Sequence, residues 1–282
     1  MLDFGLRTLD QRKLTEQGVR ELGPSVSVAR GPGGKVLSLI GREATRVSYE
    51  VKSLVAMYPW PALVAARWRG RGAVLTKETD LLIEGYPRSG NNFAVEAFQR
   101  SQPQALRVAH HVHAPAHVLA AIRSSIPAIV LIREPQDAIL SFVIRNPYIS
   151  IRQAIRGYVR FYEPLLPYRD GFVVGPFPEV TSDFGRVIRR ANNRFGTSFH
   201  EFEHTEENVR ACFEAIDRHY RVNVGTGPEV ERMVARPSEA RERLKDMLRT
   251  DYRNTRLQGL REKAQAMYEL FAGAGKPVRE QR

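Results

Sequence analysis

The loop between Gly85 and Gly90 carries the clearest chemical signal in the chain, because an apolar run precedes it and a helical pattern follows it. Backbone N–H groups at such a strand–loop–helix junction converge on an anion, which the helix dipole also favours. The two glycines have the Walker spacing, but Asn91 and Asn92 stand where a nucleotide triphosphate loop has Lys and Ser/Thr. The loop therefore lacks the lysine clamp and the Mg²⁺ ligand of an Mg·ATP site, and Arg88 is its one cation. The pattern predicts an anion cradle for a different ligand.

A second candidate anion site follows another apolar run. The run Ala128–Ile132 ends in Arg133, and Ser141 comes eight residues later in a helical pattern. An arginine at the carboxyl end of a parallel strand lies beside the crevice where ligands of such sheets bind. Arg133 and Ser141 could hold a second phosphate there. The alternatives are an ion pair of Arg133 with Glu134 or Asp137, and a serine that only occupies a helix face.

Four of the seven histidines lie between these two segments, in the stretch Ala109–His117. If a strand ends there, its histidines reach the same crevice. His113 and His117 are four residues apart, which is also a metal-ligand spacing. However, Pro115 interrupts the start of a shared helix, and no Cys, Asp or Glu nearby completes a ligand set. We therefore expect no metal, and we expect His110 and His117 to be structural or rim residues.

The chain has 282 residues and a formal net charge of +12. Such a basic excess indicates an anionic partner, for example a nucleotide, nucleic acid, a polyanionic glycan or anionic lipid. No lysine occurs between residues 78 and 244, so a cation that contacts a ligand in that span is Arg or His. Arginine suits bidentate recognition of phosphate or sulfate. Genome composition is the alternative explanation of the arginine content.

The lone cysteine, Cys212, excludes an intramolecular disulfide and fits a reducing compartment. The first ten residues lack the pattern of a signal peptide, so we expect a cytoplasmic location. Residues 53–71 combine both tryptophans with basic neighbours, as in a helix at a membrane interface. Peripheral membrane contact is therefore one interpretation of this tract, and a helix packed on the main domain is the favoured one. The uncharged stretch Ser53–Ala66 is too short to span a bilayer.

The elements that must position these residues alternate between strand and helix, which predicts an α/β fold with a mainly parallel sheet between layers of helices. We expect an N-terminal helical extension over residues 1–78 and the α/β domain with C-terminal helices over 79–282. The predicted strands are Leu81–Ile83, Ala105–Val112, Ala128–Ile132 and Gly171–Val174. The predicted helices are Val36–Met57, Ala94–Gln99, Val118–Arg123, Pro135–Ile144, Ile151–Leu166, Phe184–Phe195, Glu206–Tyr220 and two within Pro237–Ala272.

Three motifs together resemble those of the sulfotransferase superfamily that uses 3′-phosphoadenosine 5′-phosphosulfate (PAPS). They are Tyr86-Pro-Arg-Ser-Gly90, Arg133-Glu-Pro-Gln-Asp-Ala-Ile-Leu-Ser141 and, more loosely, His111-Val-His-Ala-Pro115. The segment Gly171–Glu179 looks like that family's later strand with its acidic end. The resemblance covers residues 80 to 220 and implies a P-loop-like three-layer fold, in a pared-down form typical of bacterial enzymes.

The resemblance also implies roles. The 5′-phosphosulfate of PAPS would bind the segment Tyr86, Pro87, Arg88, Ser89, Gly90, Asn91, Asn92 and Phe93, with Arg88 at the bridging oxygen and the leaving phosphate. Arg133 and Ser141 would bind the 3′-phosphate, and His113 would be the general base, with His111 as the second candidate. The chain departs from cytosolic members of the family at several positions: Asn91 and Asn92 replace hydroxyl residues, Phe93 replaces a Trp, and position 88 is Arg rather than Lys. The C-terminal Arg-Lys-Gly signature is also absent. Arg236 and Arg241 are our candidates to replace that signature.

The implied reaction moves a sulfuryl group to an acceptor hydroxyl, on a carbohydrate, a glycolipid or a small molecule, without a metal. We expect residues 145–168 and the N-terminal region to help bind the acceptor. The first of these segments has a face that carries Arg152, Arg156, Tyr158, Arg160 and Tyr162. A P-loop-type nucleotide phosphotransferase and a non-catalytic nucleotide-binding relative are the alternatives. A nucleic-acid-binding module is not expected, because the basic residues are dispersed and lack interleaved aromatics.

Overall fold

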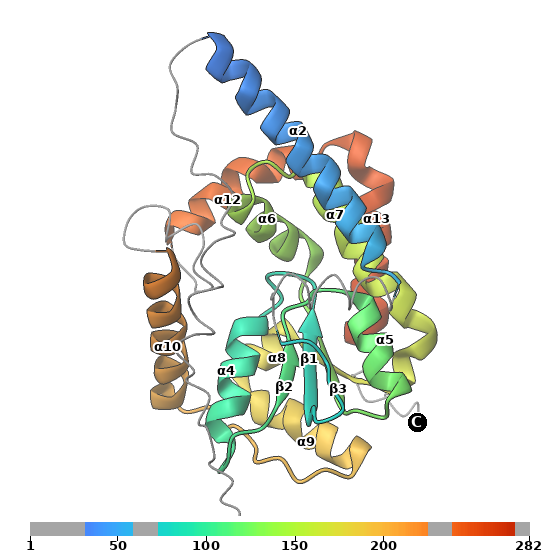
Figure 1. Cartoon of the computed structure of the whole chain (residues 1–282), viewed down its shortest axis with the longest axis vertical. Helices are drawn as coiled ribbons and strands as arrows, with labels where there is room; N and C mark the ends of the chain where they lie inside the picture. The colour runs from blue at the N-terminus through green and yellow to red at the C-terminus, as the bar shows by residue number, and fades with distance from the viewer. Residues whose placement is uncertain (1–31, 59–72, 225–238, 274–282) are drawn as a thin grey trace, which may run out of the picture. The chain divides into compact units, whose positions relative to one another are not determined.

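The computed structural model describes residues 32–58, 73–224 and 239–273. The chain divides into two compact units, Met1–Gly41 and Arg42–Arg282, and the second contains the whole described sheet (Figure 1). Arg236 and the tryptophan-bearing residues 59–71 of the proposed membrane tract lie outside the described residues.

Four parallel strands form the described sheet, in the order β2-β1-β3-β4. Their bounds are β1 Leu81–Gly85, β2 Val108–His110, β3 Ala128–Ile132 and β4 Val173–Pro176. β1 and β3 are buried along their whole length, as expected for parallel strands covered on both faces. Because all four strands run the same way, their carboxyl ends meet at one edge of the sheet.

Helices flank the sheet on both faces. In chain order the helices of the described residues are α2 Pro32–Val55, α4 Asn91–Ser101, α5 Pro115–Arg123, α6 Pro135–Arg145, α7 Ile151–Tyr162, α8 Phe177–Ser182, α9 Phe184–Phe195, α10 Glu206–Val224, α12 Glu239–Tyr252 and α13 Gln258–Ala272, with 3-10 turns at Glu163–Gly171 and Thr255–Leu257. The predicted fold class, an α/β protein with a parallel sheet between layers of helices, is confirmed.

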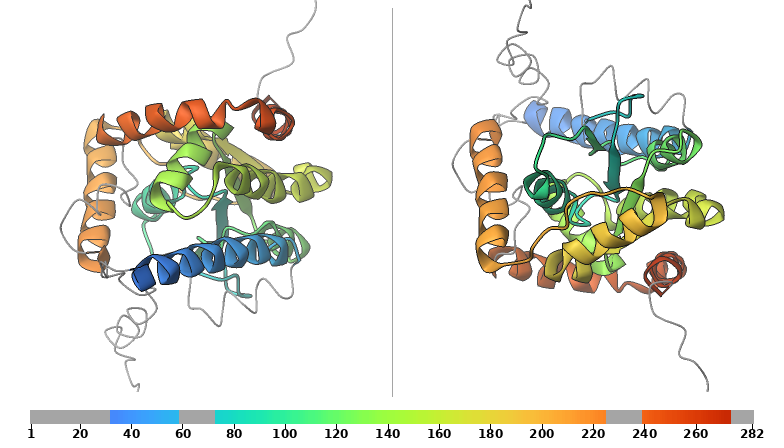
Figure 2. Two further views of the ribbon diagram at one scale, coloured as in Figure 1. Left: turned by 90° about the horizontal axis from the view of Figure 1, so that it is seen from above. Right: turned by 90° about the horizontal axis from the view of Figure 1, so that it is seen from below.

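Alternate strand residues face opposite layers of helices. Leu82 and Val130 belong to a core shared with α5, α6, α7 and α13, whereas Leu81 and Ile129 belong to a core shared with α4, α9 and α10. The two further views show helices on either side of the strands (Figure 2). Since side chains alternate along a strand, Glu84 points to the same layer as Leu82.

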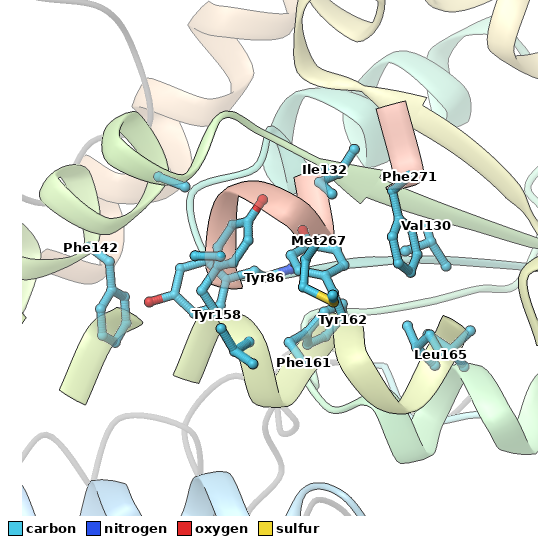
Figure 3. Packing of buried hydrophobic residues seen from close by; sticks show 14 of the residues in the cluster. Tyr86, Val130, Ile132, Phe142, Tyr158, Phe161, Tyr162, Leu165, Met267 and Phe271 are labelled. Atoms are coloured by element: carbon cyan, nitrogen blue, oxygen red, sulfur yellow. Dashed lines mark hydrogen bonds between the residues drawn. The ribbon is translucent and has the colours of Figure 1, made fainter. Parts of the chain in front are cut away.

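Tyrosines from α7 anchor the start of the β1–α4 loop in the first core (Figure 3). Tyr86 is 2% exposed, its ring centroid lies 5.2 Å from that of Tyr158, and its hydroxyl donates to the carbonyl of Ala154 at 3.1 Å. The Tyr162 hydroxyl donates to the carbonyl of Leu131 at 2.8 Å and accepts the Tyr86 N–H at 3.3 Å. Burial raises the pKa of all three phenols.

The expectation that Tyr158 and Tyr162 belong to an acceptor-binding face is therefore wrong, because both side chains are fully buried. Arg160 from the same predicted face is paired with Glu50 of α2. Arg152 and Arg156 remain exposed on α7.

Candidate anion and base site at the carboxyl edge of the sheet

The candidate site lies where the connections after β1 and β3 leave for opposite faces of the sheet. The β1 loop leads to α4, and β3 leads to α6 in the other layer. In open parallel sheets this switch point is the usual position of a ligand crevice. Arg133, the residue after β3, reaches across it and donates from Nη1 to the carbonyl oxygen of Arg88 at 3.3 Å.

The loop conformation requires both of its glycines. A Cβ on Gly85 would come within 2.6 Å of the carbonyl oxygen of Leu131 on β3. Gly90 has φ = 95°, in the left-handed region, and precedes the first residue of α4. Glycine has no side chain to cap the helix, so the first N–H groups of α4 keep the capacity to bind an anion.

The two asparagines after Gly90 are committed to contacts within the protein. The Asn91 amide donates to the carbonyl of Tyr86 at 3.2 Å, and its Oδ1 is buried without a hydrogen-bond partner among the described residues. The Asn92 amide donates to the hydroxyl of Tyr220 at 3.2 Å. Asn91 therefore ties the loop to itself, and Asn92 ties it to α10.

Ser141 lies at the centre of a guanidinium cluster. Its hydroxyl, 3% exposed, accepts from Arg88 Nε at 3.0 Å and from Arg241 Nη2 at 2.9 Å. Burial, followed by the charges of Arg241, Arg145 and Arg133, lowers the pKa of Arg88 to about 9. Arg88 also has φ = 73°, a strained conformation for a residue with a side chain. Like charges gathered in a buried site are stabilised by an anion, so the cluster is suited to binding a phosphate.

Arg133 is held in place by contacts on several sides. It pairs with Asp137 at 3.3 Å, as one of the sequence alternatives proposed, and its guanidinium lies 4.0 Å from the ring centroid of Phe177. The Tyr158 hydroxyl donates to its carbonyl oxygen at 2.7 Å. Its Nε is buried and has no hydrogen-bond partner among the described residues. The side chain is therefore fixed in direction and still has a donor to offer.

The sequence analysis missed two polar residues of this site. Arg145 donates to the Tyr220 hydroxyl at 2.8 Å. Burial alone would raise the pKa of Tyr220, but the charge and hydrogen bond of Arg145 lead the effects that lower it below its usual value. Arg145 follows Ser141 by four residues, one helical turn, and this spacing was a usable signal. Tyr220 comes from α10, and no local pattern marks it.

The structure separates the two histidines considered as bases. His113 Nδ1 lies 2.9 Å from the carbonyl oxygen of Gly85, which can only accept. Nδ1 therefore carries the proton, and in the neutral ring Nε2 is left as the acceptor. The side chain of His113 is 27% exposed. His113 thus has the tautomer and the access that a general base needs.

Both ring nitrogens of His111 are engaged, at 2.6 Å from Asn92 Oδ1 and 2.6 Å from His110 Nδ1. Burial, followed by the charges of His113 and His110, lowers the pKa of His111 to about 3. A ring held neutral in this way is poorly suited to accept a proton near pH 7. Burial also lowers the pKa of His110.

Glu84 is the third residue that the sequence analysis missed. It lies in β1 beneath the histidine loop, and its side chain is 0% exposed. Its carboxylate accepts from the backbone N–H of Val112 at 2.7 Å and from His117 Nδ1 at 2.9 Å. Burial tends to raise the pKa of Glu84, but the hydrogen bond from His117, followed by the charges that His113, His117 and His111 carry when protonated, lowers it to about 2. Within the described residues, no group of three or more His, Cys, Asp or Glu side chains is arranged to hold a metal ion.

A search of solved structures found a likeness to this chain, whereas the sequence comparisons found none. No protein-family model matches the sequence, and no curated protein matches it. Among solved structures, mouse sulfotransferase SULT7A1 complexed with PAP aligns at 14% sequence identity and a TM-score of 0.37, over 68% of this chain and 90% of that chain. A likeness at this level carries no argument about function. Of the described helices, none has the length and apolarity needed to cross a membrane.

Proposed function

We propose that this protein is a sulfotransferase that uses PAPS as donor and transfers the sulfuryl group to an acceptor hydroxyl. The observation that carries the proposal is the guanidinium cluster of Arg88 and Arg241 on Ser141, beside a strand–loop–helix cradle without a Mg²⁺ ligand. A donor with two separated anionic groups, a 3′-phosphate and a 5′-phosphosulfate, matches these two adjacent anion sites. A nucleoside triphosphate does not need the second one.

The donor would lie across the β1–β3 crevice. Its 5′ end would bind the loop from Tyr86 to Phe93 and the N-terminus of α4. Its 3′-phosphate would bind the hydroxyl of Ser141 with Arg133 and Arg241, and Arg236 remains a further candidate. Arg88 belongs to the loop, yet its side chain contacts Ser141, so it would link the two ends of the donor.

In the transfer step, the acceptor oxygen attacks sulfur and forms the new S–O bond while the S–O bond to the 5′-phosphate breaks. His113 Nε2 takes the proton of the acceptor hydroxyl, and adenosine 3′,5′-bisphosphate leaves with the bridging oxygen and its negative charge. Arg88 and the N–H groups at the start of α4 stabilise that charge. A sulfuryl group carries less negative charge than a terminal phosphoryl group, so fixed donors and arginine replace the metal.

The acceptor would be a hydroxyl on a carbohydrate, a glycolipid or a small molecule, and the enzyme would act in the cytoplasm or at a membrane surface. Arg152 and Arg156 on α7 are exposed and carry charge suited to an anionic acceptor.

Calorimetry with adenosine 3′,5′-bisphosphate in EDTA, compared with ADP, tests the donor site. We expect metal-independent binding that prefers the 3′-phosphate. Arg133→Ala should lower the affinity at least tenfold, the usual weight of a charged hydrogen bond, while the exposed control Arg156→Ala should bind as the wild type does. Stronger binding of Mg·ATP would sink the proposal and favour a phosphotransferase. Tight binding without transfer to any acceptor would favour a non-catalytic nucleotide-binding protein.

A further inference from the structure

We propose that Glu84 is a positioning residue for this reaction: its buried carboxylate shapes the histidine loop, residues 111–113, and orients His113 as the base. The proposal rests on the proposed function. Glu84 would not contact the substrate. Its buried negative charge would fix the orientation of the His113 ring.

The backbone of the histidine loop has an unusual conformation that the Glu84 carboxylate stabilises. His111 and His113 have φ values of 61° and 54°, in the left-handed region that residues with side chains rarely adopt. A residue with a side chain is strained in this conformation. The Glu84 carboxylate accepts from two successive N–H groups of this loop, those of Val112 at 2.7 Å and His113 at 3.1 Å. Alternating backbone conformations that point successive N–H groups at one anion form a nest, and here the anion is a side chain of the protein itself.

On the side away from the histidine loop, the Glu84 carboxylate is bound by His117 of α5. His117 is 0% exposed, and its Nε2 accepts the backbone N–H of Leu75 at 3.0 Å. Because a backbone N–H can only donate, the proton of the neutral His117 ring lies on Nδ1, which donates to Glu84 at 2.9 Å. Glu84 therefore joins β1, α5 and the histidine loop through donors of fixed direction.

The orientation of the His113 ring also depends on Glu84 and on its neighbour Gly85. Glu84 holds the backbone of His113, and the Gly85 carbonyl next to it accepts the His113 Nδ1 proton at 2.9 Å. This arrangement leaves Nε2 for the acceptor's proton. When that proton arrives, the ring becomes positive with its Nδ1 only 3.7 Å from the Glu84 carboxylate. An opposite charge at this distance in a buried site stabilises the charged ring.

The other titratable groups around His113 add no negative charge. His111 on the same loop has its ring centroid 5.5 Å away, and His110 lies beyond it. His117 on α5 faces the same carboxylate from the other side. Among the described groups that face His113 from β1, α5 and its own loop, Glu84 supplies the single negative charge.

Glu84 itself is not placed to act as the base. Its oxygens accept N–H groups from the loop and from His117, and its side chain is 0% exposed, so an acceptor hydroxyl cannot reach it. Its depressed pKa of about 2 is in keeping with a carboxylate that stays charged. The role left to it is to position and to stabilise.

Nitrogen-15 spectra of the histidine rings in the full-length protein test the proposal, with His113→Gln used to assign the His113 signals. In the wild type we expect one neutral His113 tautomer, with the proton on Nδ1. In Glu84→Gln we expect a mixture of the two neutral tautomers of His113. The matched control is Glu96→Gln, which removes a carboxylate paired with Arg100 on the surface of α4 and should leave the His113 tautomer unchanged.

Calorimetry with adenosine 3′,5′-bisphosphate on the same proteins separates the possible failures. We expect Glu84→Gln to bind it within about twofold of the wild type while transfer to an acceptor falls at least tenfold in kcat. A wild-type His113 protonated on Nε2 would overturn the role of Glu84 whether or not the variant folds. Unchanged His113 signals in a folded Glu84→Gln protein that binds the nucleotide would overturn it as well. A wild type that does not bind the nucleotide would instead overturn the proposed function.

Discussion

At the scale of single residues, the environment of each histidine decides which one can take a proton. His113 has a fixed tautomer and a partly exposed ring, whereas His111 has both nitrogens engaged and a pKa lowered to about 3. We expect His113→Gln to lower kcat by about 10²- to 10⁴-fold, the usual contribution of a general base, with donor binding retained. His111→Gln should cost far less. Turnover of sulfur-labelled PAPS with an acceptor found by screening measures both, and equal losses would contradict the assignment.

The hydroxyl of Ser141 supports a second prediction at this scale. It accepts hydrogen bonds from the buried guanidinium groups of Arg88 and Arg241 and orients them toward one point. We expect Ser141→Ala to weaken binding of adenosine 3′,5′-bisphosphate about tenfold, since losing a hydrogen bond to a charged group costs about 1.5–3 kcal/mol. Binding of adenosine 5′-monophosphate, which lacks the 3′-phosphate, should change little. Ser101→Ala at the end of α4 is the control, and a parallel loss for both nucleotides would remove Ser141 from the 3′-phosphate site.

At the scale of elements, the sequence patterns predicted the strands and helices well where a run is uniformly apolar or strongly amphipathic. The predicted bounds of β3 and α9 agree with the structure. β2 begins later than predicted, at Val108, and ends two residues early, because the chain turns at His111 with a positive φ and wraps around Glu84. No propensity encodes that turn, since it depends on a carboxylate from another strand.

Amphipathic patterns also do not say which partner a helix face will meet. α7 was expected to present its tyrosines to an acceptor, but the structure packs Tyr158 and Tyr162 against the sheet and against Tyr86 at the start of the β1–α4 loop (Figure 3). The motifs named Arg88 and Ser141 as candidates for different ends of the donor, and Arg241 was a candidate to replace an absent signature. The structure brings the three side chains into contact. Tyr220 and Glu84 were missed because their roles arise from contacts across elements far apart in the sequence.

The junction between the loop and α4 supports a prediction about an element. Gly90 has φ = 95°, and a Cβ there would lie 3.3 Å from the ring of Phe177. We expect Gly90→Ala to lower the free energy of unfolding by about 1–2 kcal/mol through backbone strain and to weaken donor binding. Urea unfolding measures the first effect and calorimetry the second.

The control is Gly259→Ala, which lies in α13 with nothing within 4 Å of the added Cβ. It should be neutral or stabilising by up to about 1 kcal/mol. A stable Gly90→Ala variant with normal binding would show that the loop tolerates another conformation.

At the scale of the whole molecule, the arginines that contribute to the net charge of +12 lie in two kinds of environment. Many surface arginines pair with nearby carboxylates, as Arg189 does with Glu201 at 2.6 Å. Arg88, Arg133, Arg145 and Arg241 gather at the carboxyl edge of the sheet, where burial, followed by the charges of the other three, lowers the pKa of Arg88. Arginines that gather where the strand ends meet favour an anionic ligand at that edge of the sheet.

Stability against acid is also a property of the whole molecule, and Glu84 contributes a defined part of it. Its pKa falls from 4.5 to about 2 on folding, so its contribution is fully present above pH 4.5 and is lost as the pH falls toward 2. The shift corresponds to about 3 kcal/mol. We expect the difference in unfolding free energy between wild type and Glu84→Gln to be largest from pH 5 to 7 and to shrink by about that amount on acidification, as urea unfolding at each pH can measure. The control Glu96→Gln should follow the wild type throughout. A difference between wild type and Glu84→Gln that is the same at pH 3 and pH 7 would mean that Glu84 contributes through shape rather than through its charge.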